Sequence, residues 1–170
     1  MVKSPDRFCP RCGAPLAWRT VEDRPRQVCT GCGRVHYRNA KPCAGALVVR
    51  DGRVLLVRRG SAPYKGWWDV PGGFLEPDEH PAVGAAREVR EETGLEVRPR
   101  EILAVVVDRY GPEGDPTLNI FYLAEVVGGS ERPGGDAKQI GWFGPGEIPR
   151  NVAFRNGREA LKAWVERLER

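Results

Sequence analysis

The sequence lacks any long hydrophobic run, and none approaches the ~18 residues that a membrane-spanning helix needs. No apolar stretch of signal-peptide length follows the basic N-terminus MVKSPDRFCPRC. We therefore expect a cytoplasmic protein with no membrane partner. With 41% hydrophobic and 29% charged residues in 170, the composition is globular and allows one core domain with a small accessory module.

Concentrated charge of one sign is also missing. The formal net charge is only +4, and the Lys and Arg residues are spread along the chain. Nucleic-acid-binding proteins usually gather their basic residues into a patch or stripe. The whole-chain charge therefore argues against a nucleic-acid partner and suits a small anionic substrate.

Cysteine is concentrated near the N-terminus, where CPRCG and CTGCG are separated by sixteen residues. This spacing is typical of two knuckles that close one tetrahedral zinc site. Gly13 and Gly33 permit the tight turn after each pair. A disulfide framework is the alternative, but disulfides rarely persist in the reducing compartment expected here. The predicted ligands fill all four positions, which indicates a structural zinc: Cys9, Cys12, Cys29 and Cys32.

The chain is expected to consist of a zinc ribbon over residues 1–41 and a larger domain over residues 42–170, joined at the polar bridge RVHYRNAKP. Asp51 and Gly52 form a hairpin signal between two apolar strands. Pro81 and Gly94 mark the start and end of a helix. Cys43 reads as a small buried hydrophobe. The pattern predicts strands at about 44–50, 54–58, 102–109, 118–127 and 139–143, with a second helix at about 154–168.

The helix between these signals carries a cluster of acids. Glu88 and Glu92 lie about 40° apart around its axis, and Glu91 lies about 60° to the other side of Glu88. Three carboxylates on one face repel one another unless divalent cations lie between them, and hard oxygen ligands favour Mg²⁺ or Mn²⁺. A solvated acidic face is the alternative. Val83, Ala86 and Val89 are predicted to pack on the sheet.

The segment GFLEPDEHPAVGAAREVREETGL resembles the Nudix box at all its defining positions. This resemblance implies an α+β fold, the α/β/α Nudix sandwich with a mixed sheet. It implies Mg²⁺- or Mn²⁺-dependent hydrolysis of a diphosphate linkage in a nucleoside diphosphate derivative, giving two phosphate monoesters. It assigns Arg87 the task of orienting a catalytic glutamate, with Glu79 as a second partner. The implied metal ligands are Glu88, Glu92 and Glu91, with a backbone carbonyl from Gly72 or Gly73, of which Gly73 is our candidate.

The identity of the general base stays open, because Nudix enzymes take it from different places. The candidates are Glu88 and the loop acids Glu113, Asp115 and Asp136. Arg109 and Lys65 are candidate phosphate contacts. One aromatic side chain near the site is expected to stack on the substrate, with Trp68 and Tyr110 as candidates among a group that also contains Tyr64, Trp67 and Phe74.

The ribbon, the following HYRNAKP and the closing elements at Trp142, Ile148 and Phe154 resemble bacterial NADH pyrophosphatases and plant FAD/ADP-ribose pyrophosphatases. The NADH enzymes carry SQPWPFPxS where this chain reads VVVDRYGPEGDPTLNI, which favours ADP-ribose or FAD over NADH. Such relatives often form homodimers. The alternatives are a Nudix ligand sensor, a nucleic-acid- or protein-binding module, or a hydrolase of NAD caps on RNA. The complete set of box glutamates favours an enzyme.

Overall fold

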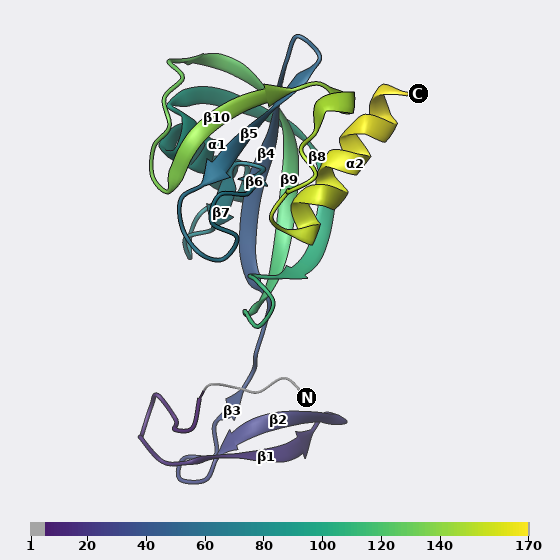
Figure 1. The fold of residues 1–170 in the computed structure, drawn as a ribbon. Helices are drawn as coiled ribbons and strands as arrows, with labels where there is room; N and C mark the ends of the chain where they lie inside the picture. Colours follow the sequence, from purple (N-terminus) through teal and green to yellow (C-terminus); the bar gives the residue numbers. More distant parts are fainter. Residues whose placement is uncertain (1–5, 170) are drawn as a thin grey trace. The chain divides into compact units, whose positions relative to one another are not determined.

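The computed structural model describes residues 6–169 of the chain. Its contacts divide the chain into two compact units, with the boundary between Asn39 and Ala40. Strands β1 to β3 belong to the first unit, and all later elements belong to the second (Figure 1). Each unit is described by itself below.

The first unit is built on a small antiparallel sheet, in the order β1-β2-β3. Its strands are β1 (Leu16–Val21), β2 (Arg24–Cys29) and β3 (Val35–His36). Glu22 and Asp23 join β1 to β2 with positive φ angles of 51° and 57°, the backbone that a two-residue hairpin turn with the native strand twist requires. The cysteine pattern alone does not predict these strands, because their side chains alternate weakly and β2 contains Pro25.

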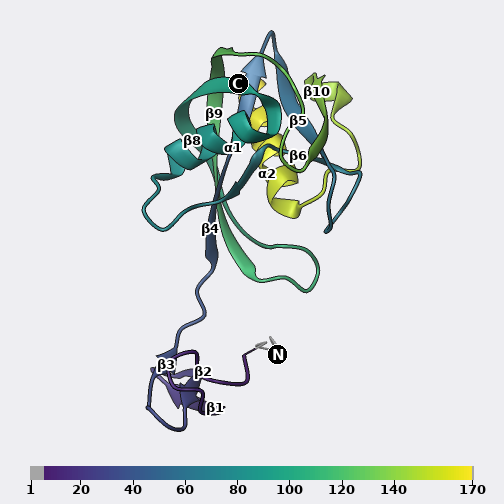
Figure 2. The same cartoon turned by 90° about the vertical axis from the view of Figure 1, so that its left-hand side faces the viewer.

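The second unit contains a seven-stranded mixed sheet, in which β10, β5, β4, β9 and β8 lie side by side in that order (Figure 2). The short strands β6 and β7 pair with β5 and β4. β4 runs parallel to β9, whereas the other pairings are antiparallel. The strands are β4 (Lys41–Arg50), β5 (Arg53–Arg59), β6 (Trp68–Asp69), β7 (Gly72–Phe74), β8 (Leu95–Arg109), β9 (Pro116–Gly129) and β10 (Ala137–Phe143).

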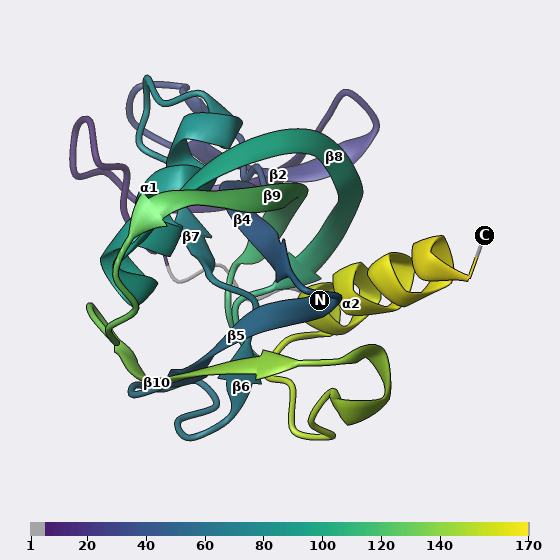
Figure 3. The same cartoon turned by 90° about the horizontal axis from the view of Figure 1, so that it is seen from above.

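Two helices cover opposite sides of this sheet (Figure 3). Helix α1 (Pro81–Thr93) packs through Ala85 and Val89 on one hydrophobic cluster, and α2 (Arg155–Leu168) packs through Leu161 and Trp164 on another. The short 3₁₀ helix η1 (Pro145–Glu147) precedes α2. This arrangement confirms the predicted α/β/α sandwich. None of the helices within residues 6–169 is both long and apolar enough to span a bilayer.

Strand β4 connects the two cores. Its side chains alternate, so that Ala46 and Val48 face the α1 cluster while Leu47 faces the α2 cluster. Gly45 must lack a side chain, since a Cβ there would lie 2.8 Å from the Pro71 carbonyl oxygen and 3.1 Å from Phe121. β4 therefore holds the loop that leads into β7 directly against the centre of the sheet.

The predicted strands are correct in kind but too short. β8 begins at Leu95 rather than near residue 102, immediately after α1, and β9 and β10 each start two residues before their predicted limits. Pro99 and the charged residues around it interrupt the apolar pattern that would otherwise predict the first half of β8 as a strand. A proline is tolerated there because β8 lies at the edge of the sheet, and the register with β9 shifts between Pro99 and Glu101.

The end of α1 provides a test of backbone strain. Gly94 and Gly52 both have φ of +72°, but a Cβ on Gly94 would lie 2.4 Å from the Ser130 carbonyl oxygen, whereas a Cβ on Gly52 would meet nothing within 4 Å. We expect Gly52→Ala to lower the free energy of unfolding by about 1 kcal/mol through the left-handed backbone alone. Gly94→Ala should cost at least about 1 kcal/mol more, because the chain must also move. Equal losses in urea unfolding would show that the contact with Ser130 is unimportant.

Candidate active site and metal centre

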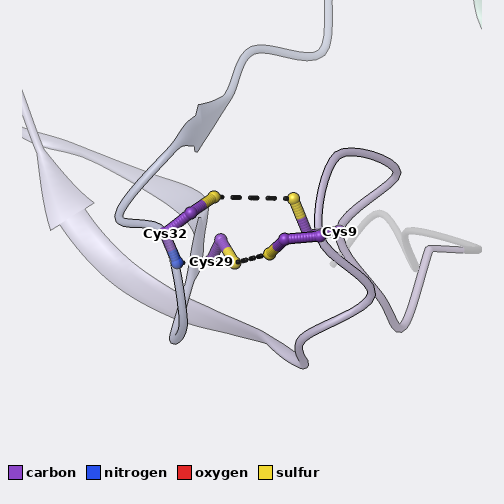
Figure 4. A group of neighbouring side chains, drawn as sticks. Cys9, Cys29 and Cys32 are labelled. Atoms are coloured by element: carbon purple, nitrogen blue, oxygen red, sulfur yellow. Dashed lines mark hydrogen bonds between the residues drawn. The ribbon is translucent and has the colours of Figure 1, made fainter.

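The four ribbon cysteines bring their sulfur atoms together, and Figure 4 labels three of them, Cys9, Cys29 and Cys32. All four Sγ atoms lie within 4.8 Å of one another. Cys9 Sγ is 3.9 Å from Cys32 Sγ, and Cys12 Sγ is 3.4 Å from Cys29 Sγ. A tetrahedral site with zinc–sulfur bonds of about 2.3 Å separates its sulfurs by about 3.8 Å. The arrangement therefore fits one zinc ion held by four thiolates.

Backbone turns position these sulfurs. Gly13 N donates to Cys9 O at 2.8 Å and Gly33 N donates to Cys29 O at 3.1 Å, and both glycines have positive φ, at 72° and 71°. The amide of Cys32 donates to Cys29 Sγ at 3.3 Å, and this hydrogen bond lowers the pKa of Cys29 to about 6. This hydrogen bond thus favours the thiolate of Cys29, the form that binds metal.

Helix α1, which carries the glutamates, is capped at both ends. The His80 side chain caps the N-terminus by accepting from Ala82 N at 3.2 Å, and Pro81 occupies the first helical position. Gly94 ends the helix in the left-handed conformation, and its amide donates to Arg90 O at 2.9 Å. The structure confirms the helix predicted from Pro81 and Gly94.

The core side of α1 differs from the prediction. Val83 is 60% exposed, so the prediction that it packs on the sheet is wrong, while Ala85 is fully buried beside Val89. Positions 85, 89 and 92 follow one another at helical spacing, and this places Glu92 on the edge of the core side, where it is only 8% exposed. The three glutamates therefore do not share one solvent-exposed face, because Glu92 lies between the core-facing side of the helix and its solvent-facing side.

Arg87 ties the acidic side chains together. Its guanidinium donates to both carboxylate oxygens of Glu79, at 2.7 and 2.8 Å. One of its Nη atoms also reaches Glu88 Oε1 at 2.8 Å and both oxygens of Glu91 at 3.4 Å. This geometry confirms that Arg87 pairs with glutamates and includes Glu79 as a partner.

Two glycines of the PGG turn fit closely against the helix. The Gly72 amide donates to Glu92 Oε2 at 3.1 Å. A Cβ on Gly73 would lie 2.5 Å from Glu88 Oε1, so only glycine leaves room for that carboxylate. β7 thereby brings the backbone at residue 73, our candidate carbonyl ligand, beside Glu88.

Burial sets the charge state of these acids. Removal from water raises the pKa of Glu88, and it raises the pKa of Glu92 well above its ordinary value, with the negative charges of Asp136 and Asp69 adding to the effect. Glu79 differs, because hydrogen bonds from Arg87 lower its pKa to about 2. Glu79 therefore stays ionised as a fixed counter-ion, whereas burial disfavours the ionised forms of Glu88 and Glu92.

A second group of charged residues lies close to Glu92. Arg59 Nη1 donates to Asp69 Oδ2 at 3.2 Å, and Arg59 Nη2 lies 4.0 Å from Asp136 Oδ2. Burial raises the pKa of Asp69 to about 7. Ser61 Oγ donates to Asp136 at 2.8 Å. Of the loop acids considered as general base, Asp136 is thus the one electrostatically coupled to Glu92.

A cavity opens beside β7 and receives only some of the predicted substrate contacts. Arg109 and Tyr110 line it, whereas Lys65 is exposed elsewhere and Trp68 packs edge-on against Phe143, 4.9 Å between ring centroids. Asp115 pairs with Lys41 at 2.9 Å, and Glu113 is exposed in the loop before it. The cavity lining also includes Arg59, Asp69, Gly72, Gly73, Phe74, Asn119, Phe154 and Asn156.

Several residues that line the cavity could not be recognised from local sequence patterns. Arg59 follows Arg58 at the end of an apolar strand and resembles a solvated terminus, yet it is 9% exposed. Phe154 stacks on Tyr110 at 5.5 Å across 44 residues of chain, a contact that only the fold creates. Cys43 also lines the cavity. Cys43 is buried, as predicted for a small hydrophobe, and burial raises the pKa of its thiol to about 11, which disfavours the nucleophilic thiolate.

These features define a hydrolase of the Nudix class, in which a glutamate helix and a glycine turn lie beside a cavity. The chain belongs to the Nudix family: the NUDIX domain matches residues 40–165. The Nudix N-terminal zinc-ribbon family matches residues 7–38. The protein is therefore a Nudix pyrophosphohydrolase with an N-terminal ribbon.

Individual relatives agree with this assignment. The chain is 31% identical to the ADP-ribose pyrophosphatase of Methanocaldococcus jannaschii, over 69% of each protein. It is 34% identical to an NAD-capped RNA hydrolase of Chromobacterium violaceum, over 91% of this chain but only 58% of that protein. A crystal structure of a NUDIX hydrolase from Nitrosomonas europaea superposes with a TM-score of 0.83 at 34% identity, covering 96% of this chain and 93% of the other.

The sulfur cluster predicts that metal removal acts locally. A strong chelator should unfold residues 6–39, because a sheet of three short strands buries too little apolar surface to persist alone. The larger unit has its own two cores and should stay folded. Tryptophan resonances followed by NMR would separate the two, since Trp18 reports on the ribbon and Trp164 on α2. Simultaneous loss of both signals would contradict this independence.

Burial of Glu92 predicts a trade-off between stability and function. Its folded-state pKa is raised above the unfolded value, so the contribution of Glu92 to stability falls as pH rises above about 4.5. Without divalent cations at neutral pH, Glu92→Gln should raise the free energy of unfolding by about 1–3 kcal/mol. The gain should vanish at acidic pH and shrink when magnesium is added. Glu91→Gln, at a largely exposed side chain, is the matched control and should give no such gain.

Proposed function

We propose that the protein uses Mg²⁺ or Mn²⁺ to hydrolyse the diphosphate linkage of a nucleoside diphosphate derivative, with ADP-ribose or FAD favoured, and releases two phosphate monoesters. The observation that carries this proposal is the link between Arg87 and the helix carboxylates, directly beside the glycine turn. Glu88 lies so close to Gly73 that no side chain fits between them. The acids and the turn therefore form one site.

The residues present fit a hard divalent cation. Every proposed ligand offers oxygen, from the Glu88, Glu92 and Glu91 carboxylates and the Gly73 carbonyl, as Mg²⁺ and Mn²⁺ prefer. The raised pKa values of Glu88 and Glu92 mark a place where added positive charge would be stabilising. A bound ion would polarise phosphate oxygens and lower the pKa of the attacking water.

The chain's own residues have separable roles in this proposal. Arg87 fixes Glu88, using Glu79 as its permanent counter-ion, so that the carboxylate is held before substrate arrives. The Gly72 amide holds Glu92. Glu88 or Asp136 accepts the proton of the attacking water. Asp136 is favoured among the loop acids because Arg59 and Ser61 orient it close to the glutamates.

The cavity supports a substrate with a flat ring system next to its phosphates. Tyr110 and Phe154 present near-parallel rings, 23° apart, and Tyr110 lies 5.4 Å from Phe74. Adenine and flavin have the shape to pack against such rings. Arg109 lies at the same cavity and is the proposed phosphate contact. The named activity of the Methanocaldococcus jannaschii relative, an ADP-ribose pyrophosphatase, supports this substrate class.

A second candidate is hydrolysis of NAD caps at the 5′ end of RNA. The observation in its favour is that the Chromobacterium violaceum relative with that name matches 91% of this chain, including the ribbon. This chain spans only 58% of that relative's length, so the activity of the longer protein is carried over here as a proposal. Both candidates use the same glutamate site and differ in what is attached to the nucleotide.

One assay panel tests both candidates. Purified protein with magnesium would be offered ADP-ribose, FAD, NADH, diadenosine polyphosphates, nucleoside triphosphates and NAD-capped RNA, with products identified by phosphorus NMR or chromatography. We expect ADP-ribose or FAD to have the highest kcat/KM, and Glu92→Gln to lower it at least about a hundredfold without loss of fold. Highest turnover on capped RNA would favour the second candidate.

Two results would count against the assignment. Tight binding of one compound without any turnover would support a ligand sensor. Unchanged turnover in Glu92→Gln would remove Glu92 from the metal site. Val83→Gln, an exposed position on the same helix, is the control and should retain wild-type activity.

A further inference from the structure

We propose that the zinc ribbon binds single-stranded nucleic acid on a groove formed by β1, β2 and β3, with Trp18 stacking on a base and arginines of the groove contacting phosphates. This surface is separate from the glutamate site and does not depend on which diphosphate is hydrolysed. Whole-chain charge argued against such a partner. Within the ribbon, however, the distribution of residues is different.

The ribbon exposes aromatic rings that it does not use for its own core. Phe8, Trp18 and Tyr37 are 61%, 57% and 52% exposed. They are three of the six strongly exposed aromatic side chains among residues 6–169, although the ribbon supplies only about a fifth of those residues. An exposed tryptophan gives up favourable burial, which suggests that its ring is stabilised by a partner.

The sheet register places Trp18 beside hydrogen-bonding side chains. Trp18 lies opposite Gln27, and Gln27 lies opposite His36, so the three residues form a row across the three strands. Side chains in directly opposed positions share one face of a sheet. This row lies in a groove that Arg24, Arg26 and Arg38 also line. A flat ring and polar groups are therefore available to the same ligand.

The charge of the ribbon suits a polyanion. Residues 6–39 contain seven arginines and only three acids, with no lysine. No acidic side chain lines the groove. Arg26 lies over the Tyr37 ring at 4.4 Å and pairs with the exposed Glu22 at 3.3 Å, which holds its guanidinium in place. Arginine is the residue best suited to phosphate, since its planar fork can donate two hydrogen bonds at once.

Two groove residues also contain unsatisfied polar atoms. Arg26 Nε and His36 Nε2 are buried and have no hydrogen-bond partner within the part of the chain that the structure describes. Leaving a buried polar atom unpaired costs about 1–3 kcal/mol. Native proteins pair such atoms with water, an ion or a ligand, or leave them unpaired at functional sites. A ligand that shifts these side chains could satisfy both atoms.

The combination favours a single-stranded nucleic acid over other partners. Bases stack on aromatic rings regardless of sequence, and phosphates follow a line of basic side chains. A duplex hides the faces of its bases and so could not use Trp18. A protein partner would call for a wider apolar surface, whereas Trp18 and Pro25 are the only apolar members of this lining.

Fluorescence anisotropy tests the proposal with the full, zinc-loaded chain. The probes are labelled single strands of about twelve nucleotides, as RNA and as DNA of the same sequence, and the corresponding duplex. We expect one or both single strands to bind at least about tenfold more tightly than the duplex. Preference for RNA over DNA would identify the 2′-hydroxyl as a contact. No binding at low salt, or equal binding of the duplex, would overturn the proposal.

Matched variants separate the groove from general positive charge. Trp18→Ala should weaken binding roughly five- to hundredfold, whereas Trp18→Phe should restore most of it because a ring remains. Arg24→Ser should weaken binding and lower the salt dependence. Arg34→Ser removes the same charge in the ribbon outside the groove and should have little effect. Equal losses of affinity in both arginine variants would show that binding is nonspecific electrostatic attraction and would overturn the proposed groove.

Two further measurements keep the interpretation clear. Zinc content should be unchanged in every variant, so that a loss of binding is not a loss of folding. Hydrolysis of the best small substrate should be unchanged in Trp18→Ala, because Trp18 lies outside the catalytic unit. Failure of the oligonucleotide to bind leaves the proposed hydrolysis standing, and absence of hydrolysis leaves the binding measurement valid.

Discussion

The hydrogen bonds from the Arg87 guanidinium to the neighbouring glutamates are the interactions on which the glutamate site depends. Carboxylates on adjacent turns of a helix repel one another, and α1 carries three of them with a fourth, Glu79, in the preceding loop. A single arginine that donates to Glu79, Glu88 and Glu91 turns this repulsion into a fixed cluster. Lysine could not replace it, because one ammonium group cannot present donors in several directions of one plane.

The rest of the larger unit holds this cluster against the cavity. β4 contributes to both hydrophobic cores, and its Gly45 lets the Pro71 carbonyl approach the sheet. The chain then continues through Gly72 and Gly73, whose lack of side chains lets α1 approach. Close packing has a consequence for chemistry here: the contacts that order Glu88 and Glu92 also remove them from water, which raises their pKa values.

Local patterns allowed much of the fold and part of the site to be predicted. The limits of α1 follow from Pro81 and Gly94, and the cysteine spacing anticipates the four clustered sulfurs, because both signals lie within a few residues. Contacts distant in sequence were beyond such reasoning. Nothing near Arg59 reveals that Asp69, Tyr110 and Phe154 surround it. The prediction that Val83 packs on the sheet was wrong for a related reason. Helical spacing gives several candidate faces, and only contact with the sheet decides which face is buried.

The ribbon and the larger unit carry groups suited to metals of opposite character. The ribbon offers four soft thiolates with no position left for water, whereas α1 offers hard carboxylates that are incompletely compensated. Ligand softness and site geometry select metals more strongly than affinity alone. A zinc ion in the ribbon would therefore have little tendency to exchange with the magnesium proposed for the glutamates. In the proposed function, the closed thiolate site would keep the ribbon sheet folded while the open glutamate site gains and loses cations and phosphates during turnover. A filled zinc site would thus support the proposed Trp18 groove whatever cations occupy the glutamates.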